Sequence, residues 1–509
     1  MNLLTEQWIP VRPLPMGVPE KISLRRLLCG DGIWELCLPR DDMELAALQL
    51  LVCLAQVLFT PADAQTLKQR IASLLPKDEF HAGCEPFKNW FWVDHTDHPF
   101  MQIRGVKAKE PTQMDKLLAG LTGATNSCFV NQPGLGKCLC PGCAAIALFN
   151  QASCVPSFGG GFKAGLRGGS PITTLVQGKH LRQTIWLNVL CKERLLHDIS
   201  WYTDTIHQKQ TWVEPIKAGE KIAAERIGLM RGLLWQPAHI ELLPPTEKGI
   251  CSCCGFQTEE AYSGFKKAKF NFSVNGIWPH PHTPRISFTK NGQIEEKFAA
   301  FKTSAPSWTQ LSRFVVQQQI DNSNKEGQQP AAVIRQVKFL FGGKAQRLSL
   351  LVGGYRNKQA SILERRHEVF TLIHGWDRHT LEIKQLVKMG IGYRDALYKA
   401  INVFVKGIKD IKGAGVKLQQ IAERSYYRRS ESTVLDALAQ IDFENAAPEL
   451  TRMGDKLIRI VKDLFEELIR PYLNDPELVR TMAVARRTLN KHLRALKPQQ
   501  DGGDENETA

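Results

Sequence analysis

The chain has 509 residues, of which 43% are hydrophobic and 23% charged, values that exclude a largely disordered protein. A chain of this length is too long for a single hydrophobic core, so we expect at least two domains. Its net charge of +15 favours a polyanionic partner, with nucleic acid as the first candidate. No apolar run reaches the length of a membrane span and the first residues lack a signal-peptide pattern, so we expect a cytoplasmic protein without a membrane partner.

The first strongly patterned element is a helix that begins at Asp41 or Asp42. Either carboxylate can cap the apolar run that follows from Met43 to Ala55, and this run is apolar on nearly all sides, which predicts a buried helix. Residues 116–143 read instead as a glycine-containing loop. In it, Phe129 offers a stacking face and Asn131 an amide that reads base edges, although Phe129 could equally pin the loop to the core.

Thirteen cysteines without a secretory signal argue against a disulfide scaffold. Two C-x-x-C pairs, Cys140/Cys143 and Cys251/Cys254, have the spacing with which a tight turn supplies two thiolates to one metal ion. Together they predict a structural zinc site that ties two distant segments together and has no open position for catalysis. Reduced thiols or a redox pair are the alternative reading.

A glycine-rich stretch follows from Pro156 to Ser170. Its glycines, which include Gly159 and Gly160, make a poor helix and a poor strand, but they let the backbone approach a ligand closely. Lys163 and Arg167 suit an anionic partner. The stretch therefore predicts a loop that faces nucleic acid, and a mobile surface loop without function is the alternative.

The next segments are less decisive. Residues 173–176 and 184–190 are rich in β-branched and apolar side chains, which predicts two strands. The dipeptide His197-Asp198 resembles that of metal-dependent phosphohydrolases, which would need further ligands elsewhere.

A basic run lies beyond the second cysteine pair. Lys266, Lys267 and Lys269 are interleaved with aromatic residues, and in a strand Lys267 and Lys269 would share one face. This pattern predicts a basic edge against nucleic acid, and a solvated charged face is the alternative.

Ser361 and Glu364 have the spacing of a capping box, which predicts that a helix begins there. Lys358, Gln359 and Ala360 would then project just ahead of the helix N-terminus, where unsatisfied N–H groups suit a phosphate or a base edge.

Amphipathic helical stripes dominate from about residue 381 onward, and short connections between them imply an antiparallel four-helix bundle. We therefore expect an α+β protein with a mixed α/β domain at 1–375, the bundle at 376–498 and an acidic disordered tail at 499–509. The bundle carries surface cations that contact phosphates or simply solubilise it: Arg424, Arg428, Arg429, Arg486, Arg487, Lys491 and Arg494.

Many segments in this order resemble the CasA family, the large subunits of the type I-E CRISPR surveillance complex called Cascade. They include L-P-R-D-D-M-E-L-A-A-L at 38–48, F-V-N-Q-P-G at 129–134, F-G-G-G-F-K at 158–163, R-G-L-L-W-Q-P-A-H-I-E-L at 231–242, C-S-C-C-G at 251–255 and G-G-Y-R-N-K-Q-A-S-I-L-E-R-R-H at 353–367. The resemblance covers essentially the whole chain and is looser over the bundle.

The resemblance implies a mixed α/β domain of unusual fold followed by a four-helix bundle. It also implies a function in antiviral defence. The family recognises the protospacer-adjacent motif of double-stranded target DNA, mostly from the minor groove, and starts strand separation. Its partners are the other Cascade subunits with guide RNA and a helicase–nuclease, which docks on this subunit and destroys the target. The bundle helps to hold the displaced strand.

The resemblance also implies site residues. The family's glycine loop falls on Ser157 to Gly161, with Gly160 as the backbone contact, and its minor-groove lysine falls on Lys269. Its recognition loop falls on 129–131, and the wedge that parts the first base pairs falls on 358–360. Two positions depart from the family pattern, which has glycine at Ser157 and asparagine at Lys358, so these are the positions at which motif tolerance and strand separation could differ in this chain.

We therefore expect a DNA-recognition subunit that is not an enzyme, with no catalytic residue and no small-molecule substrate. Two other functions are consistent with the same residues. A stand-alone zinc-containing DNA-binding regulator would bind specific sequences without guide RNA, and a metal-dependent nuclease would use His197 and Asp198.

Overall fold

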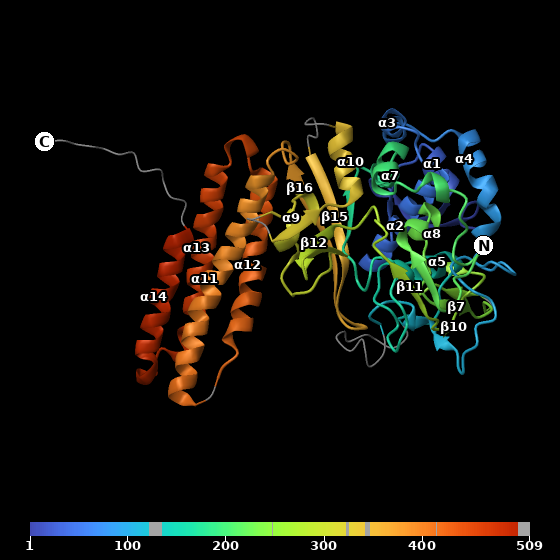
Figure 1. Cartoon of the computed structure of the whole chain (residues 1–509). Helices are drawn as coiled ribbons and strands as arrows, with labels where there is room; N and C mark the ends of the chain where they lie inside the picture. The colour runs from blue at the N-terminus through green and yellow to red at the C-terminus, as the bar shows by residue number, and fades with distance from the viewer. Residues whose placement is uncertain (122–134, 247, 322–324, 342–346, 414, 497–509) are drawn as a thin grey trace. The chain divides into compact units, whose positions relative to one another are not determined.

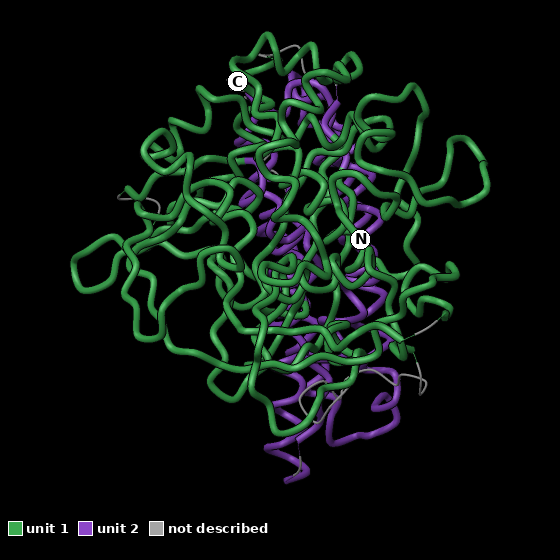
Figure 2. The backbone as a smooth tube through the Cα atoms, turned by 90° about the vertical axis from the view of Figure 1, so that its right-hand side faces the viewer, with its two compact units in different colours: residues 1–304, 316–342, 349–370 green, residues 305–315, 343–348, 371–509 purple. Residues whose placement is uncertain are grey.

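The computed structural model describes residues 1–121, 135–246, 248–321, 325–341, 347–413 and 415–496. The chain divides into two compact units (Figure 2). Unit 1 comprises Met1–Ser304, Val316–Gly342 and Ser349–Phe370, and unit 2 comprises Ala305–Val315, Gly343–Leu348 and Thr371–Ala509. The acidic tail expected at 499–509 and the expected site residues Phe129 and Asn131 lie outside the described residues.

Unit 1 mixes short helices with small sheets (Figure 1). Its helices are α1 (Leu24–Cys29), α2 (Asp41–Leu58), α3 (Ala64–Ala72), α4 (Lys77–Cys84), α5 (Pro141–Ser153), α6 (Leu181–Leu187), α7 (Lys192–Asp198), α8 (Leu229–Leu233) and α10 (Ala332–Phe341). The predicted helix at Asp41 is confirmed as α2, which is buried along nearly its whole length and packs against α5 and α6. The core of unit 1 therefore forms around α2.

Within the described residues, six small sheets complete the α/β part. They are β2–β1–β3 (Glu20–Ser23, Gln7–Pro13, Trp34–Leu36), β4–β10–β7 (Thr112–Gln113, Gly264–Ala268, His239–Leu242), β11–β6 (Phe272–Asn275, Glu220–Ala223), β13–β12–β14 (Gln293–Phe298, Arg285–Lys290, Glu326–Gln329), β16–β15–β5 (Ser361–Ile373, Arg347–Lys358, Thr173–Gln177) and β8–β9 (Gly249–Ile250, Gln257–Thr258). Strand β5 confirms the strand expected at 173–176.

The helix predicted from Ser361 is wrong, because this segment is strand β16, which pairs with β15. Its buried side chains recur at even positions, Ile362, Arg366 and Phe370 among them, so one face of an extended chain meets the core. Glu364 serves no helix cap. Its carboxylate accepts hydrogen bonds from Arg366 Nε at 3.0 Å and, from the paired strand, Arg356 Nε at 2.7 Å.

The strand predicted at 184–190 is also wrong, since most of this stretch belongs to helix α6. The ring of His180 caps the helix by accepting a hydrogen bond from the backbone N–H of Gln183. Asn188 ends the helix and bonds both backbone groups of Val176 in β5 through its side-chain amide, each at 2.7 Å. This segment therefore meets β5 as a helix. The side chain of Asn188 makes the backbone hydrogen bonds with β5 that a neighbouring strand would otherwise make.

Unit 2 contains four long helices in its described part, together with the short α9 (Leu311–Val315). The long helices are α11 (Thr380–Lys412), α12 (Leu418–Gln440), α13 (Ala447–Ile469) and α14 (Val479–Leu496). Helix α11 packs against each of the other three, as the orange and red ribbons of Figure 1 show. The predicted helical bundle is confirmed. Among the helices that the structure describes, none combines the length and the apolar character that a membrane span needs.

Candidate nucleic-acid interface

The glycine loop, Ser157–Gly161, follows helix α5 and exposes its backbone. Gly159, Gly160 and Gly161 have φ angles of 77°, 56° and 90°. This is a left-handed backbone conformation that residues other than glycine rarely adopt. No atom lies within 4 Å of the position that a Cβ of Gly160 would take. The tip of the loop therefore offers backbone groups to a partner without side chains in the way.

Aromatic side chains fix the loop on strand β10. Phe158 and Phe162 meet edge to face with ring centroids 5.4 Å apart, and Phe158 lies 6.0 Å from Phe265 of β10. The Nζ atom of Lys267 lies over both rings, 4.3 Å from the centroid of Phe158 and 5.8 Å from that of Phe162. Burial, with a contribution from Lys116, lowers the pKa of Lys267. These contacts pack the loop against β10.

Lys269 reaches the loop tip from just beyond the end of β10. Its exposed side chain donates a hydrogen bond from Nζ to the carbonyl oxygen of Gly160 at 3.0 Å. The same Nζ lies 3.3 Å from the position that a Cβ of Gly161 would take. The ammonium group and the exposed glycine backbone thus form one surface, and both Lys267 and Lys269 contact the glycine loop.

A β-hairpin brings a third segment to this surface. Strands β15 and β16 are joined by the hairpin tip, Gln359 and Ala360, where Gln359 has a φ of 54°. Lys358 and Gln359 are exposed, and the Cβ of Ala360 lies 3.1 Å from the position that a Cβ of Gly159 would take. Gln359 and Ala360 therefore project from a two-residue turn and not from the start of a helix, which corrects the geometry expected from the sequence.

Arg167 lies near the glycine loop in sequence, but it is only 3% exposed. Its guanidinium group donates to Thr173 Oγ1, Thr283 Oγ1, Gln49 Oε1 and the backbone oxygen of Ser153. Burial lowers its pKa. The expectation that Arg167 suits an external anion is therefore wrong, because its donors hold the interior of unit 1 together.

The cysteine cluster consists of Cys140, Cys143, Cys251 and Cys254, whose four Sγ atoms lie within 4.8 Å of one another. Cys140 directly precedes α5, and Cys251–Cys254 form a tight turn in which the N–H of Gly255 bonds the carbonyl oxygen of Cys251 at 2.9 Å. The Sγ atoms of Cys140 and Cys254 are 3.8 Å apart, close to the roughly 3.8 Å edge of a tetrahedron with Zn–S bonds of about 2.3 Å. The donor set therefore fits a structural zinc ion.

Lys21 lies beside this cluster and donates from Nζ to Sγ of Cys140 at 3.2 Å. A cation at this position offsets part of the negative charge that four thiolates bring together. Cys138, which sequence reasoning left as a spare thiol, lies outside the set and donates to the carbonyl oxygen of Ile250.

The dipeptide His197-Asp198 ends helix α7. Asp198 pairs with Arg335 at 2.5 Å and its side chain is only 5% exposed, whereas His197 is 59% exposed. Within the described part of the chain, the cysteine cluster is the only group of three or more potential ligands that could hold a metal ion. Asp198 thus serves a buried ion pair.

Sequence reasoning missed the role of Phe158 and Phe162 as anchors of the loop. The available signal was the i, i+4 spacing of two phenylalanines around glycines. A second signal was the i, i+2 spacing of Phe265 and Lys267, which places both side chains on one face of a strand. This signal identifies partners only when the two segments are known to be adjacent.

Comparisons with known proteins agree with the fold. A sequence model of the family described as CRISPR-associated protein Cse1 matches residues 2–464. CasA of Thermus thermophilus is 17% identical, with a TM-score of 0.72 over 97% of this chain and 99% of that chain. Cse1 of Thermobifida fusca is also 17% identical, with a TM-score of 0.72 over 98% and 99%. A chain of a CRISPR RNA-guided surveillance complex is 14% identical, with a TM-score of 0.63 over 96% and 99%.

Proposed function

This chain belongs to the CRISPR-associated Cse1 family, the large subunits of type I-E Cascade, and we propose that it recognises the protospacer-adjacent motif in double-stranded target DNA. In this proposal it acts with the other Cascade subunits and their guide RNA. Guide pairing supplies the sequence identity of the target, while this subunit reads a short duplex motif and starts strand separation. It carries out no chemical step itself.

The single observation that supports the proposal best is the convergence of the glycine loop, Lys269 and the hairpin tip. Lys269 contacts Gly160, and Ala360 adjoins Gly159, although the three segments are far apart in sequence. A minor groove about 6 Å wide admits a bare backbone and a slender lysine more readily than a helix. Its degenerate pattern of acceptors would permit several related motifs. Ser157 would restrict the backbone freedom of the loop slightly, so its motif tolerance would differ from that of the family.

The hairpin tip is suited to part the base pairs beyond the motif. A two-residue turn is narrow, and Gln359 is exposed at its apex beside Lys358. Unstacking a base step costs a few kcal/mol, which growing guide–target pairing offsets, so no ATP is needed. Lys358 adds a cation where the family has asparagine, and it would strengthen contact with a nearby phosphate.

Zinc in the cysteine cluster would act as a structural staple. It would join the start of α5, which leads into the glycine loop, to the turn at Cys251–Cys254, which leads toward β10 and Lys269. Cys140, Cys143, Cys251 and Cys254 would hold the ion in a closed sphere of four thiolates.

We further propose that this subunit docks the helicase–nuclease and that unit 2 helps to hold the displaced strand. Two of its expected phosphate-binding cations are engaged in ion pairs, Arg429 with Glu467 and Arg486 with Glu466, both at 2.7 Å. The exposed cations Arg424, Arg428, Arg487, Lys491 and Arg494 are therefore the stronger candidates for contact with the strand.

The test measures target binding by the reconstituted complex on duplexes with and without the motif. Lys269→Ala and Gln359→Ala should reduce motif preference and strand opening. Lys266→Ala is the matched control, because Lys266 lies in β10 and alternates to the face opposite Lys267, whose side chain contacts the glycine loop. Survival of both properties in both site variants would refute the assignment. Sequence-specific binding by the isolated chain would favour the regulator, and metal-dependent cleavage lost with His197→Ala would favour the nuclease.

A further inference from the structure

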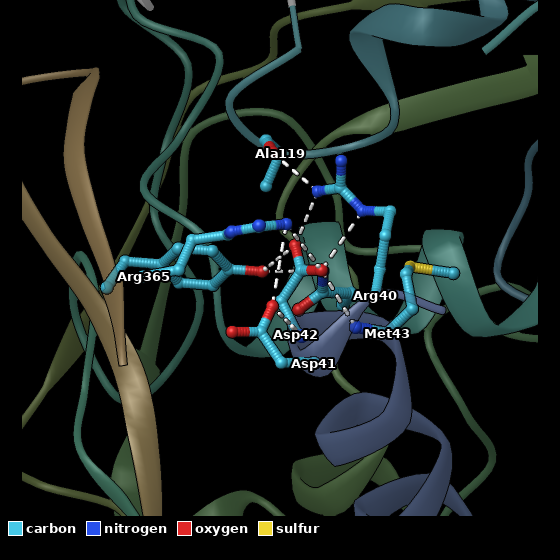
Figure 3. Close-up of polar contacts among 8 residues, drawn as sticks. Arg40, Asp41, Asp42, Met43, Ala119 and Arg365 are labelled. Atoms are coloured by element: carbon cyan, nitrogen blue, oxygen red, sulfur yellow. Dashed lines mark hydrogen bonds and ion pairs between the residues drawn. The ribbon is translucent and has the colours of Figure 1, made fainter. Parts of the chain in front are cut away.

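A buried polar hub surrounds the carboxylate of Asp42, near the start of α2 (Figure 3). Oδ1 accepts hydrogen bonds from Arg40 Nε at 3.1 Å and the backbone N–H of Met43 at 3.0 Å, and Oδ2 accepts from Arg40 Nη2 at 2.7 Å. The hydroxyl of Tyr355 donates to Oδ2 at 2.9 Å, and Arg365 Nη1 lies 3.4 Å from Oδ1. One carboxylate thus gathers two arginines and a tyrosine.

The partners of Asp42 come from both strands of the hairpin. Tyr355 belongs to β15 and Arg365 to β16, so one carboxylate bonds both strands near the tip, four residues before Gln359 and five residues after Ala360. The Tyr355 hydroxyl also accepts a hydrogen bond from Asn150 Nδ2 of α5 at 2.8 Å. The hub therefore joins α2, α5 and the hairpin.

An apolar cluster adjoins the hub and reaches the glycine loop. It consists of Ala119, Cys154, Val155, Tyr355 and Ile362, all at most 6% exposed. Val155 lies two residues before Ser157, and Tyr355 and Ile362 flank the hairpin tip on its two strands. Arg40 closes the arrangement by donating from Nη2 to the carbonyl oxygen of Ala119 at 2.7 Å. The residues just before the glycine loop and the residues that flank the hairpin tip are thus packed together.

Charge explains why Asp42 dominates this arrangement. Its side chain is 5% exposed and that of Arg40 is 16% exposed. Burial is the largest contribution and lowers the pKa of Arg40, but the charge and hydrogen bonds of Asp42, together with Tyr355 and Cys253, raise it, and the net pKa is raised. The pKa of Tyr355 is raised by burial and by the same carboxylate, so its hydroxyl stays protonated and donates. Replacing the Asp42 carboxylate by a neutral group would leave the half-buried Arg40 guanidinium without an anionic hydrogen-bond partner in the hub.

We propose that Asp42 is a positioning residue that sets the hairpin tip against the glycine loop and thereby determines how this subunit reads and opens duplex DNA. The inference rests on the proposed function. Strand β15 extends three residues beyond Tyr355 to Lys358, a lever of about 10 Å at about 3.3 Å per residue. A tilt of about 5° at the level of Tyr355 would move the end of the strand by about 0.9 Å. The contact between Ala360 and Gly159 would not survive such a shift unchanged.

The test uses two hub variants and a matched control. Asp42→Asn removes the charge at almost constant size, and Tyr355→Phe removes a single hydroxyl, which keeps the test possible if the first variant folds poorly. Asp198→Asn is the control. Asp198 is also 5% exposed and paired with an arginine, but its partner Arg335 belongs to neither the loop nor the hairpin.

Two measurements are made on the reconstituted complex. The first is hydrogen exchange in peptides that cover 157–161 and 356–361, which reports on the hub without DNA. The second is the ratio of affinities for duplexes with and without the motif. For Asp42→Asn we expect faster exchange in both peptides and a drop of about tenfold in the ratio, equivalent to ~1.4 kcal/mol. Tyr355→Phe should change both in the same direction by less, and Asp198→Asn should change neither.

The two measurements separate the inference from the proposed function. Exchange and affinity ratio like those of the unmodified complex in both hub variants would overturn the inference alone. An equal fall in the ratio with Asp198→Asn would overturn it as well, because general destabilisation would then account for the effect. An unmodified complex without any motif preference would overturn the proposed function, and the inference with it, even if the exchange rates changed as expected.

Discussion

Replacing Gly160 by alanine separates backbone strain from lost DNA contact. Gly160 has a φ of 56° with no atom within 4 Å of its added Cβ, so the folded chain would carry only the left-handed penalty of about 1–2 kcal/mol. Gly168→Ala is the matched control. It lies in the same stretch, has a φ of 78° and also has nothing within 4 Å. Both variants should lose the same stability in chemical denaturation.

DNA binding should distinguish the two variants. The new methyl group of Gly160→Ala stands beside the carbonyl that accepts from Lys269, on the surface proposed to enter the minor groove. Loss of one backbone hydrogen bond to DNA, about 1 kcal/mol, together with the steric conflict predicts about a tenfold weaker motif-dependent affinity. Equilibrium binding of the reconstituted complex measures it. Equal effects of Gly160→Ala and Gly168→Ala, or no effect of either, would refute the reasoning.

Three further predictions concern metal, salt and pH. Cys254→Ser should remove zinc, measured by elemental analysis, and lower the thermal midpoint; absence of zinc from the unmodified protein would contradict this. Lys269→Ala should reduce the slope of log affinity against log salt by about 0.9, and an unchanged slope would argue against a phosphate or groove contact. Burial and nearby Arg167 lower the pKa of His282 to about 3 and that of His280 in the same direction, so the folded state binds fewer protons than the unfolded state below pH 6.5. The free energy of unfolding should therefore fall as pH drops from 6.5 toward 3, by up to about 1.4 kcal/mol per pH unit for each histidine. A flat profile in denaturant titrations between pH 7 and pH 5 would contradict this sign.

The parts of the fold that the sequence predicted well have strong local patterns. Helix α2 is set by a long apolar run and helices α11 and α13 by apolar periodicity, so their existence follows from the residues alone. The cysteine cluster follows from the spacing of two C-x-x-C pairs, because a tight turn brings both thiols of a pair to one side.

The wrong predictions came from local signals that tertiary contacts override. The capping-box spacing of Ser361 and Glu364 suggested a helix, but pairing with β15 and burial of alternate side chains stabilise a strand. At 184–190, β-branched residues suggested a strand, while His180 caps a helix and Asn188 satisfies the backbone of β5.

The site itself needed long-range information. The glycine loop, Lys269 and the hairpin tip each carry a weak local signal, and their adjacency depends on the packing of α2, α5 and the β15–β16 hairpin. The resemblance to CasA named these segments together, but it could not reveal the Asp42 hub that joins their roots. That hub became visible only from side-chain contacts between residues more than 300 positions apart, as the separation of 313 between Asp42 and Tyr355 shows.

Photo-crosslinking from a reactive group placed in the minor groove of the motif tests the central claim most directly. With the reconstituted complex bound to its target duplex, we expect crosslinked peptides that contain the glycine loop, Lys269 or the hairpin tip. We also expect Lys269→Ala to reduce their yield while Lys266→Ala leaves it unchanged. Crosslinks confined to the helices of unit 2, or to another subunit, would contradict the account.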